Sequence, residues 1–310
     1  MKQLISPNGT PASRLTYGTM QFGDAADAAA SRAMYDAARA AKITHFDTAY
    51  VYTDGASETL LGQMVQPERD DLVIATKAAF AEGSNSQYIL RQFDVSRQRL
   101  QLDMIDLFYL HRFDDDTPLE DTFAALASLQ QQGKIRYIGV SNFAAWQVMK
   151  AQAVAATFGT RIDVIQPMYN LVKRQAEVEI MPMCMDQDIA IVPYSPLGGG
   201  LLTGKYARGE IGRLTENDMY AARYGQSWMH DTARDFSALA DDLNVTPATL
   251  AVAWAAAHPS APNPIVSGRS AEQLAPSLLA EAFEMTPELH AQIAALSPTP
   301  APATDRLEEA

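Results

Sequence analysis

The sequence predicts an α/β protein built as one (β/α)8 TIM barrel, and two observations lead to this prediction. Short runs rich in β-branched and aromatic residues recur along the chain, each followed by a longer segment with helical periodicity. Most intervals between successive runs are roughly 25 to 35 residues, about the length of a βαβ repeat. The eight candidate strands are Leu15–Gly18, Thr44–Asp47, Leu72–Thr76, Ile105–Leu110, Tyr137–Val140, Val164–Gln166, Ala190–Pro193 and Pro264–Val266.

Length and composition are compatible with a single barrel. The chain has 310 residues, and α/β barrels commonly reach about 250 residues or more as one domain. Hydrophobic residues make up 47% and charged residues 20% of the chain, as in ordinary globular proteins, which excludes global disorder. Because no linker divides the sequence, residues 1–310 are expected to form one domain.

Both ends of the chain depart from the repeat. Pro-Asn-Gly at positions 7–9 separates Gln3–Ile5 from Ser13–Leu15, a pattern that predicts a short N-terminal β-hairpin below the barrel. Ser297–Ala310 is rich in proline and acidic residues, so it is expected to be a loose tail.

A longer departure follows the seventh strand. The interval from Pro193 to Pro264 exceeds the usual repeat, and its first part, Gly198–Tyr224, is rich in glycine, arginine and tyrosine. This part is predicted to be a long loop, which in compact domains usually serves as a lid or binding loop. Helical periodicity resumes at about Asp231.

Charge and cysteine content limit the classes of partner. The formal net charge of -13 argues against nucleic acid and anionic membranes as partners. Cys184 is the only cysteine, which excludes an intramolecular disulfide and a metal site made of several cysteines. The N-terminus has no apolar segment, and no apolar run approaches the ~20 residues of a membrane-spanning helix. These features predict a cytoplasmic protein, while no feature predicts its oligomeric state.

Four ionisable residues lie at or just after the ends of predicted strands. Asp47 closes the second strand, Tyr52 lies in the loop that follows, and Lys77 and His111 follow the third and fourth strands. In barrels of this class the carboxyl ends of the strands carry the chemistry. We therefore expect these side chains to lie together at the mouth of the barrel.

This group matches the needs of proton delivery to a carbonyl oxygen. Tyr52 would be the acid, but a free tyrosine has a pKa of about 10. A neighbouring Lys77 ammonium would lower that pKa, and Asp47 would keep the ammonium charged and in place. His111 could donate a hydrogen bond to the carbonyl oxygen.

Each of these residues also has an ordinary structural interpretation. Asp47 and Lys77 could form a structural ion pair between adjacent strands, Tyr52 could lie in a surface loop, and His111 could be a hydrogen-bonded residue at the barrel rim. Their occurrence at successive strand ends favours a shared site.

Several blocks around these residues form a recognisable pattern, namely Phe46-Asp47-Thr48-Ala49-Tyr50-Val51-Tyr52, Ser57-Glu58, Leu61-Gly62, Thr76-Lys77, Asp106–His111, Gly133–Phe143 and Pro193-Tyr194-Ser195-Pro196-Leu197. Taken together they resemble the aldo-keto reductase family, and the resemblance runs from about Leu15 to the helix after Arg269. It implies NADP(H)-dependent reduction of aldehydes or ketones to alcohols, with Asp47, Tyr52, Lys77 and His111 as the catalytic tetrad and Tyr52 as the acid.

The resemblance also implies residues that bind the nicotinamide cofactor. No GxGxxG motif follows the first strand, so a Rossmann domain is not predicted. Ser141, Asn142 and Gln166 are implied to bind the carboxamide and Tyr194 to stack on the ring. Their alternative roles are a helix N-cap for Ser141 and Asn142 and barrel filling for Gln166 and Tyr194.

Further along the chain the resemblance extends to the pyrophosphate and adenosine. It implies that Ser195 and Leu197 also contact the cofactor, with Leu197-Gly198 continuing the wall beside the pyrophosphate. In the same loop, Lys205, Arg208 and Arg213 could clamp phosphate or simply be solvated.

Arg269, before a predicted helix, corresponds to the position that binds the adenosine 2′-phosphate. A guanidinium beside free backbone N–H groups suits a phosphate, which favours NADP(H) over NAD(H). Gln273 corresponds to an adenosine ligand, and a solvated loop residue is the alternative for Arg269. The chain departs from the family at Ser267-Gly268 and Pro276-Ser277, which leaves the adenine contacts open.

Aromatic residues near the expected mouth are candidates to shape a pocket for a small carbonyl substrate, although each could also be a packing residue. Tyr50 stands beside the four ionisable residues in sequence and is the strongest candidate. The full set is Tyr50, Phe22, Phe80, Phe113, Tyr169 and Trp228.

Two other functions remain as alternatives. His45 and Asp47 alternate to one side of a strand, as in metal-dependent barrel hydrolases, but only five histidines exist and three lie in the insertion or late helices. The other alternative is a non-catalytic NADPH-binding sensor, the role attributed to the cytosolic potassium-channel β subunits that resemble this family. The chain lacks a long extra arm for docking a partner, which favours catalysis.

Overall fold

The computed structural model describes residues 2–306 and residue 308. All eight predicted strands are present, and their ends differ from the predicted ends by at most two residues. The strands are β1 Thr16–Gly18, β2 His45–Asp47, β3 Val73–Ala78, β4 Ile105–Leu110, β5 Ile135–Ser141, β6 Val164–Gln166, β7 Ala190–Ile191 and β8 Ile265–Val266.

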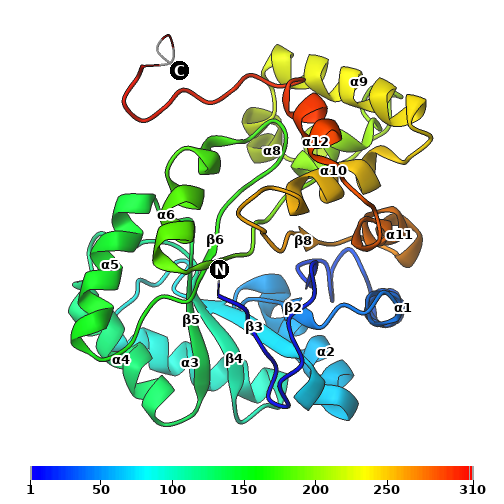
Figure 1. Cartoon of the computed structure of the whole chain (residues 1–310). Helices are drawn as coiled ribbons and strands as arrows, with labels where there is room; N and C mark the ends of the chain where they lie inside the picture. Colours follow the sequence, from blue (N-terminus) through cyan, green and yellow to red (C-terminus); the bar gives the residue numbers. More distant parts are fainter. Residues whose placement is uncertain (1, 307, 309–310) are drawn as a thin grey trace.

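The strands form a closed parallel barrel. Their hydrogen-bonded order is β7-β6-β5-β4-β3-β2-β1-β8, and every pair is parallel. The two ends of this order meet, because the amide of Asn263 donates to the Ile191 carbonyl and the amide of Ile265 donates to the Pro193 carbonyl, both at 2.8 Å. The predicted (β/α)8 fold is therefore confirmed (Figure 1).

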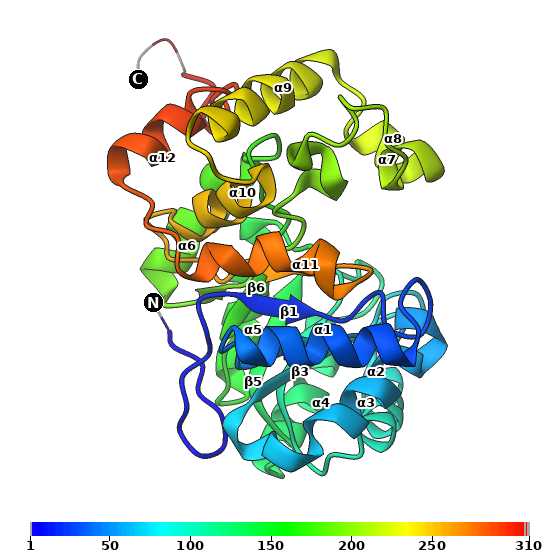
Figure 2. The ribbon, with the colours of Figure 1, turned by 90° about the vertical axis from the view of Figure 1, so that its right-hand side faces the viewer.

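Helices surround the strands, and Figure 2 shows α1 and α11 side by side across the first and last strands. No helix in the described part of the chain is long and apolar enough to span a membrane. The longer helices are α1 Ala28–Ala40, α2 Ala56–Val65, α3 Ser86–Leu100, α4 Leu119–Gln131, α5 Ala145–Thr157, α6 Ile180–Gln187, α9 Ser227–Asp242, α10 Pro247–Ala256, α11 Ala271–Leu278 and α12 Pro287–Ala294.

The core has two parts because side chains alternate across each strand. Val73, Ala75 and Leu107 belong to a cluster inside the barrel, whereas Ile74 and Phe108 pack in the larger core between strands and helices. Continuing this alternation places the polar side chains at the ends of β2, β3 and β6 inside the barrel. The upper end of the barrel interior is therefore polar while its lower part is apolar.

The predicted N-terminal hairpin is present, with a correction to its second arm. Ile5 pairs with Pro11, and the Ala12 amide donates to the Leu4 carbonyl at 2.8 Å. The second arm is therefore at Pro11–Ala12 and not at Ser13–Leu15, because the chain reverses between Ser6 and Thr10 and then runs into β1. Leu4 joins the interior cluster and closes the lower end of the barrel.

The segment after β7 is more helical than predicted. It contains the 3-10 helix η4 at Gly198–Thr203, the short helices α7 at Arg213–Glu216 and α8 at Asp218–Arg223, and α9 begins at Ser227 instead of about Asp231. The side chain of Asn217 caps α8 by accepting from the amides of Met219 and Tyr220.

Two expectations about chain organisation stay predictions. They are the extent of a single domain over residues 1–310 and the loose tail over 297–310, within which residues 307, 309 and 310 lie outside the described residues.

Candidate active site

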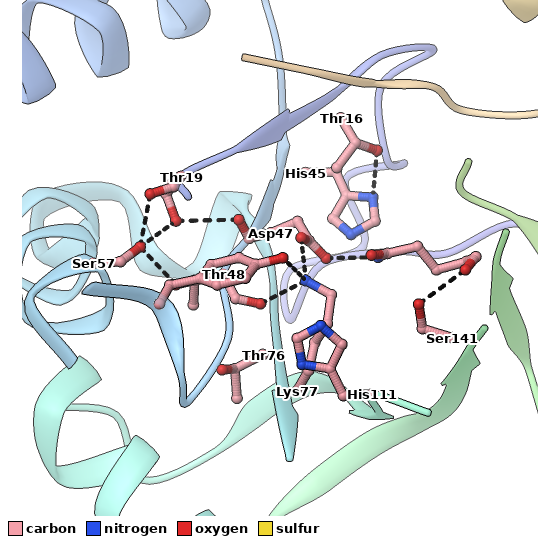
Figure 3. A network of polar contacts seen from close by, with 12 residues as sticks. Thr16, Thr19, His45, Asp47, Thr48, Ser57, Thr76, Lys77, His111 and Ser141 are labelled. Carbon is pink, nitrogen blue, oxygen red and sulfur yellow. Dashed lines mark hydrogen bonds and ion pairs between the residues drawn. The ribbon is translucent and has the colours of Figure 1, made fainter. Parts of the chain in front are cut away.

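The four ionisable residues predicted to lie together do lie together at the mouth of the barrel, and Figure 3 shows Asp47, Lys77 and His111. Asp47 is the last residue of β2, Tyr52 begins the 3-10 helix η1 at Tyr52–Gly55, and His111 directly follows β4. Lys77 lies inside β3, one residue before its end, where the sequence had placed it just after the strand. Because parallel strands end at the same rim, residues far apart in sequence meet there.

The centre of the site is a buried ion pair. The Lys77 ammonium donates a short hydrogen bond to the Asp47 carboxylate and a second, at 2.7 Å, to the Thr48 carbonyl. The other Asp47 oxygen accepts from the Gln166 amide at 2.9 Å. Lys77 is fully buried and Asp47 is 2% exposed, so pairing and these further bonds offset the cost of removing two charges from water.

Tyr52 lies against this pair. Its hydroxyl is 3.5 Å from the Lys77 Nζ, which also lies 5.0 Å from the centroid of the Tyr52 ring. Although burial opposes the ammonium, the adjacent Asp47 carboxylate raises the pKa of Lys77 above its usual value. Lys77 therefore stays charged beside the phenol.

The net shift in the pKa of Tyr52 differs from the prediction that Lys77 would lower it. Burial raises the pKa of Tyr52, and the Lys77 charge lowers it only in part. The lysine acts in the predicted direction, but desolvation of the phenolate outweighs it. Tyr52 therefore holds its proton at neutral pH, which suits a proton donor.

His111 forms the opposite wall of the site. Its ring is nearly perpendicular to that of Tyr52, with centroids 5.9 Å apart, and lies 4.8 Å from the Phe80 ring. Burial, followed by the positive charges of Lys77 and Arg112, lowers the pKa of His111 to about 3. Its Nδ1 atom is buried and has no hydrogen-bond partner among the described residues. The imidazole is therefore neutral over the physiological range.

His45 lies deeper in the barrel and does not support a metal site. Its Nδ1 contacts the Thr16 hydroxyl at 3.0 Å, and burial, with a contribution from Lys77, lowers its pKa to about 3. Within residues 2–306, no group of three or more histidine, cysteine, aspartate or glutamate residues could hold a metal ion.

The candidate nicotinamide residues form a polar cluster next to the ion pair. The Ser141 hydroxyl donates to the Gln166 carbonyl at 2.9 Å, and the Asn142 amide donates to the His111 carbonyl at 3.0 Å. The Tyr194 hydroxyl donates to the Asn142 side chain at 2.7 Å. The alternative role of Ser141 and Asn142 as a helix cap is wrong, because α5 begins three residues later and Ala144 occupies the cap position.

A cavity of about 900 Å³ opens at this end of the barrel. Asp47, Tyr52 and His111 line it, as do Gln166 and Tyr194, which therefore do not merely fill the barrel. All eight candidate cofactor residues line this one cavity, namely Ser141, Asn142, Gln166, Tyr194, Ser195, Leu197, Arg269 and Gln273.

Arg269 lines the cavity three residues after the end of β8. Its amide donates to the Gln273 side chain at 2.6 Å, and the Ser270 side chain caps α11. Its guanidinium lies 3.5 Å from the carboxylate of Glu216 on α7, so the alternative of a purely solvated residue does not describe it. At the two family departures, Pro276 lines the cavity and Ser277 is buried.

Of the aromatic substrate candidates, Phe80 alone lines this cavity within the described residues. Phe22 is fully buried in the outer core, 5.7 Å from the Tyr17 ring. Tyr50 is half-buried, with the Arg99 guanidinium 4.8 Å from its ring. Neither residue lines the cavity, and Phe22 belongs to the core. The other candidates make contacts elsewhere: Phe113 packs against Phe143, Tyr169 packs against Trp254, and the Trp228 indole N–H donates to the Gln226 side chain.

A buried carboxylate to which no role was assigned from the sequence supports the site. Glu58, fully buried on α2, accepts from the Thr76 hydroxyl at 2.6 Å and from Arg99 at 3.1 Å. Arg99 also donates to the Tyr50 carbonyl at 2.9 Å. Glu58 thus joins β3, which carries Lys77, to the loop that carries Tyr52. Spacing along the chain contains no signal for this contact between two helices.

Basic residues outside the list of candidate cofactor residues also line the cavity. Lys205, Arg208 and Arg213, left undecided by the sequence, line the cavity. Two further arginines, Arg112 and Arg223, line it too. The only signal for Arg112 was its position two residues after the end of a strand, and Arg223 lies in a segment whose helices were not predicted.

A parallel barrel with a buried lysine–carboxylate pair, a tyrosine and a histidine beside one large cavity defines the class of protein. Comparison with known families agrees, because the model of the Aldo/keto reductase family matches residues 14–298. The chain belongs to this family and is therefore an oxidoreductase that uses a nicotinamide cofactor.

Individual relatives extend over most of the chain. A probable voltage-gated potassium channel subunit beta of rice is 32% identical over 93% of this chain and 93% of its own length. An uncharacterized oxidoreductase of Bacillus subtilis is 33% identical over 96% of this chain and 95% of its own. Aflatoxin B1 aldehyde reductase member 2 of mouse is 36% identical over 68% of this chain and 61% of its own length.

The buried His45 makes stability depend on pH in a defined direction. Its pKa is about 3 in the folded protein against an ordinary value of 6.5, so below the latter the unfolded chain binds a proton that the folded chain does not. The free energy of unfolding should then fall with decreasing pH, by about 1.4 kcal/mol per pH unit from this residue. Urea unfolding of His45→Asn should show a shallower decline than wild type.

The control is His230→Asn, which changes an exposed histidine on α9. If the free energy of unfolding declined equally with decreasing pH in wild type and His45→Asn, the account of His45 would be contradicted.

Proposed function

We propose that the protein reduces aldehydes or ketones to alcohols with NADP(H), with Tyr52 as the general acid, and that it acts in the cytoplasm. One observation carries the proposal. The Tyr52 hydroxyl, 3.5 Å from the Lys77 ammonium, borders the same cavity as all eight candidate cofactor residues. A proton donor thus lies beside the place where a hydride donor would bind.

The reaction balances with these groups. A bound reduced nicotinamide supplies a hydride to the carbonyl carbon. Tyr52 donates its proton to the carbonyl oxygen, which forms the alcohol and leaves a phenolate. Lys77 stabilises that phenolate, and Asp47 keeps Lys77 charged inside the barrel.

His111 orients the carbonyl oxygen as a neutral donor. A neutral imidazole carries one proton, and a buried N–H without an acceptor is costly. Since Nδ1 is buried without a partner among the described residues, the proton belongs on Nε2. His111 lines the cavity, so that N–H can donate to the substrate oxygen beside Tyr52.

The polar cluster fits the carboxamide of a nicotinamide. Ser141, Asn142 and Gln166 supply a hydroxyl and two amides on adjacent strand ends, which match the donors and acceptor of that group. The Tyr194 ring, fixed by its hydrogen bond to Asn142, offers a plane for stacking.

The surroundings of Arg269 support a preference for NADP(H) over NAD(H). Arg269 precedes α11, whose N-terminal amides and dipole favour an anion. A 2′-phosphate would compete with Glu216 for this guanidinium. Lys205, Arg208 and Arg213 line the same cavity and are candidates for the other phosphates.

A non-catalytic NADPH-binding sensor is the second candidate function. The rice and Arabidopsis relatives, 32% and 31% identical, are named as probable potassium channel β subunits. Very slow turnover combined with tight retention of NADPH would favour this alternative.

Replacing the proposed acid tests the first function. Tyr52→Phe removes the hydroxyl and keeps the ring, so the rate of NADPH oxidation with an aromatic aldehyde should fall by roughly 100-fold or more. Quenching of tryptophan fluorescence by NADPH should persist. Tyr88→Phe, on α3 outside the cavity, is the control. Activity within a few-fold of wild type in Tyr52→Phe would exclude Tyr52 as the acid.

The proposed role of Arg269 in binding the 2′-phosphate is tested by measuring cofactor preference. In Arg269→Gln, kcat/KM for NADPH should fall by about tenfold, the equivalent of 1.4 kcal/mol, while kcat/KM for NADH changes little. Arg32→Gln, on α1, is the charge-matched control. A wild-type protein that prefers NADH, or equal losses for both cofactors, would refute the assigned role.

A further inference from the structure

Arg112 and Arg223 are cations at the mouth of the cavity without acidic partners. Both line the cavity, and neither forms an ion pair with a carboxylate of residues 2–306 or residue 308. Two other arginines of the same cavity, Arg208 and Arg269, each have one, in Glu210 and Glu216, whereas Arg213 and Lys205 have none among the described residues. In a chain with a net charge of -13, cations left unpaired at one opening mark a place for an anionic ligand.

Both arginines lie beside the groups assigned to the reaction. The Arg112 guanidinium lies over the Phe80 ring, 5.4 Å from its centroid, and that ring is 4.8 Å from the His111 ring. Arg112 is also close enough to add to the effect of burial and Lys77 in lowering the pKa of His111. It therefore stands on the side where Tyr52 and His111 meet the substrate.

Arg223, the last residue of α8, approaches from the segment above the mouth. Its guanidinium lies 5.3 Å from the centroid of the Tyr220 ring, and Tyr220 also lines the cavity. Its charge opposes the rise in the pKa of Tyr194 that burial causes. Arg223 is therefore near the proposed nicotinamide face, whereas Arg269 lies at α11.

We propose that the substrate is an aldehyde or ketone that carries a carboxylate, held by Arg112 and Arg223 while its carbonyl points to Tyr52 and His111. This inference rests on the proposed function. The guanidinium fork matches a carboxylate with two parallel hydrogen bonds, and the exposed Phe80 ring offers apolar contact to the carbon skeleton between the two ends. Binding the far end of the molecule orients its carbonyl.

The cofactor phosphates have other partners. Lys205, Arg208, Arg213 and Arg269 line the same cavity and are the residues proposed above for those phosphates, with Arg213 on the Tyr220 ring at 5.4 Å. The acidic surface as a whole gives little attraction to an anion, but charges separated by more than about 8 Å are largely screened at physiological ionic strength. Local contacts with the two arginines therefore decide whether a substrate with a carboxylate is preferred over a neutral one.

The test compares 4-formylbenzoate with its neutral methyl ester, using NADPH as the reductant. The two differ in charge at the far end and also in intrinsic reactivity, so the quantity to follow is the ratio of their kcat/KM values across variants. That ratio should fall roughly five- to tenfold in Arg112→Gln and in Arg223→Gln. It should fall further in the double variant, and also at high salt in wild type.

Arg234→Gln is the matched control, because it removes one positive charge from α9 outside the cavity. Its ratio should equal that of wild type. Thermal melting of each variant separates a change of substrate preference from loss of folding.

A ratio that is the same in wild type and in both variants would overturn the proposal. So would a rise in KM for NADPH with no change in the ratio, since the arginines would then bind the cofactor. If neither aldehyde is reduced, the proposed function fails separately. Calorimetric binding of 4-formylbenzoate then decides the role of the arginines, because the proposal requires that binding to be lost in the double variant.

Discussion

The ion pair between Lys77 and Asp47 is the interaction on which the rest of the site depends. Two charges lie inside the barrel almost without solvent, and such burial is tolerable only when every charge is paired and hydrogen-bonded. The Thr48 carbonyl and the Gln166 amide complete that requirement. The pair therefore links β2, β3 and β6, and its loss on one side would leave a buried charge that costs roughly 3 to 5 kcal/mol.

Around this pair the barrel separates two tasks. The strands fix the charges in a rigid interior, while the loops supply groups that meet a ligand. Tyr52 lies between the two, in a loop that Glu58 and Arg99 tie to the neighbouring elements. Because burial raises the pKa of Tyr52 more than Lys77 lowers it, the phenol remains a donor whose conjugate base the ammonium can stabilise.

The sequence predicted the features that follow from short-range pattern. Alternation of strands and helices gave the barrel, and the common rim of parallel strands brought Asp47, Lys77 and His111 together. Prediction from the sequence failed where burial in the folded chain decides the position or the pKa of a side chain. Aromatic type alone does not distinguish a cavity wall from a core, as the fully buried Phe22 shows. The net shift in the pKa of Tyr52 depends on desolvation that no spacing reveals.

The most direct test of the account is the fate of the hydride. The protein would be incubated with an aldehyde and NADPH deuterated at C4 of the nicotinamide ring, and the alcohol examined by mass spectrometry and NMR. The account predicts a single deuterium on the carbon that bears the new hydroxyl group. An alcohol without deuterium, or bound NADPH that never yields alcohol, would contradict it.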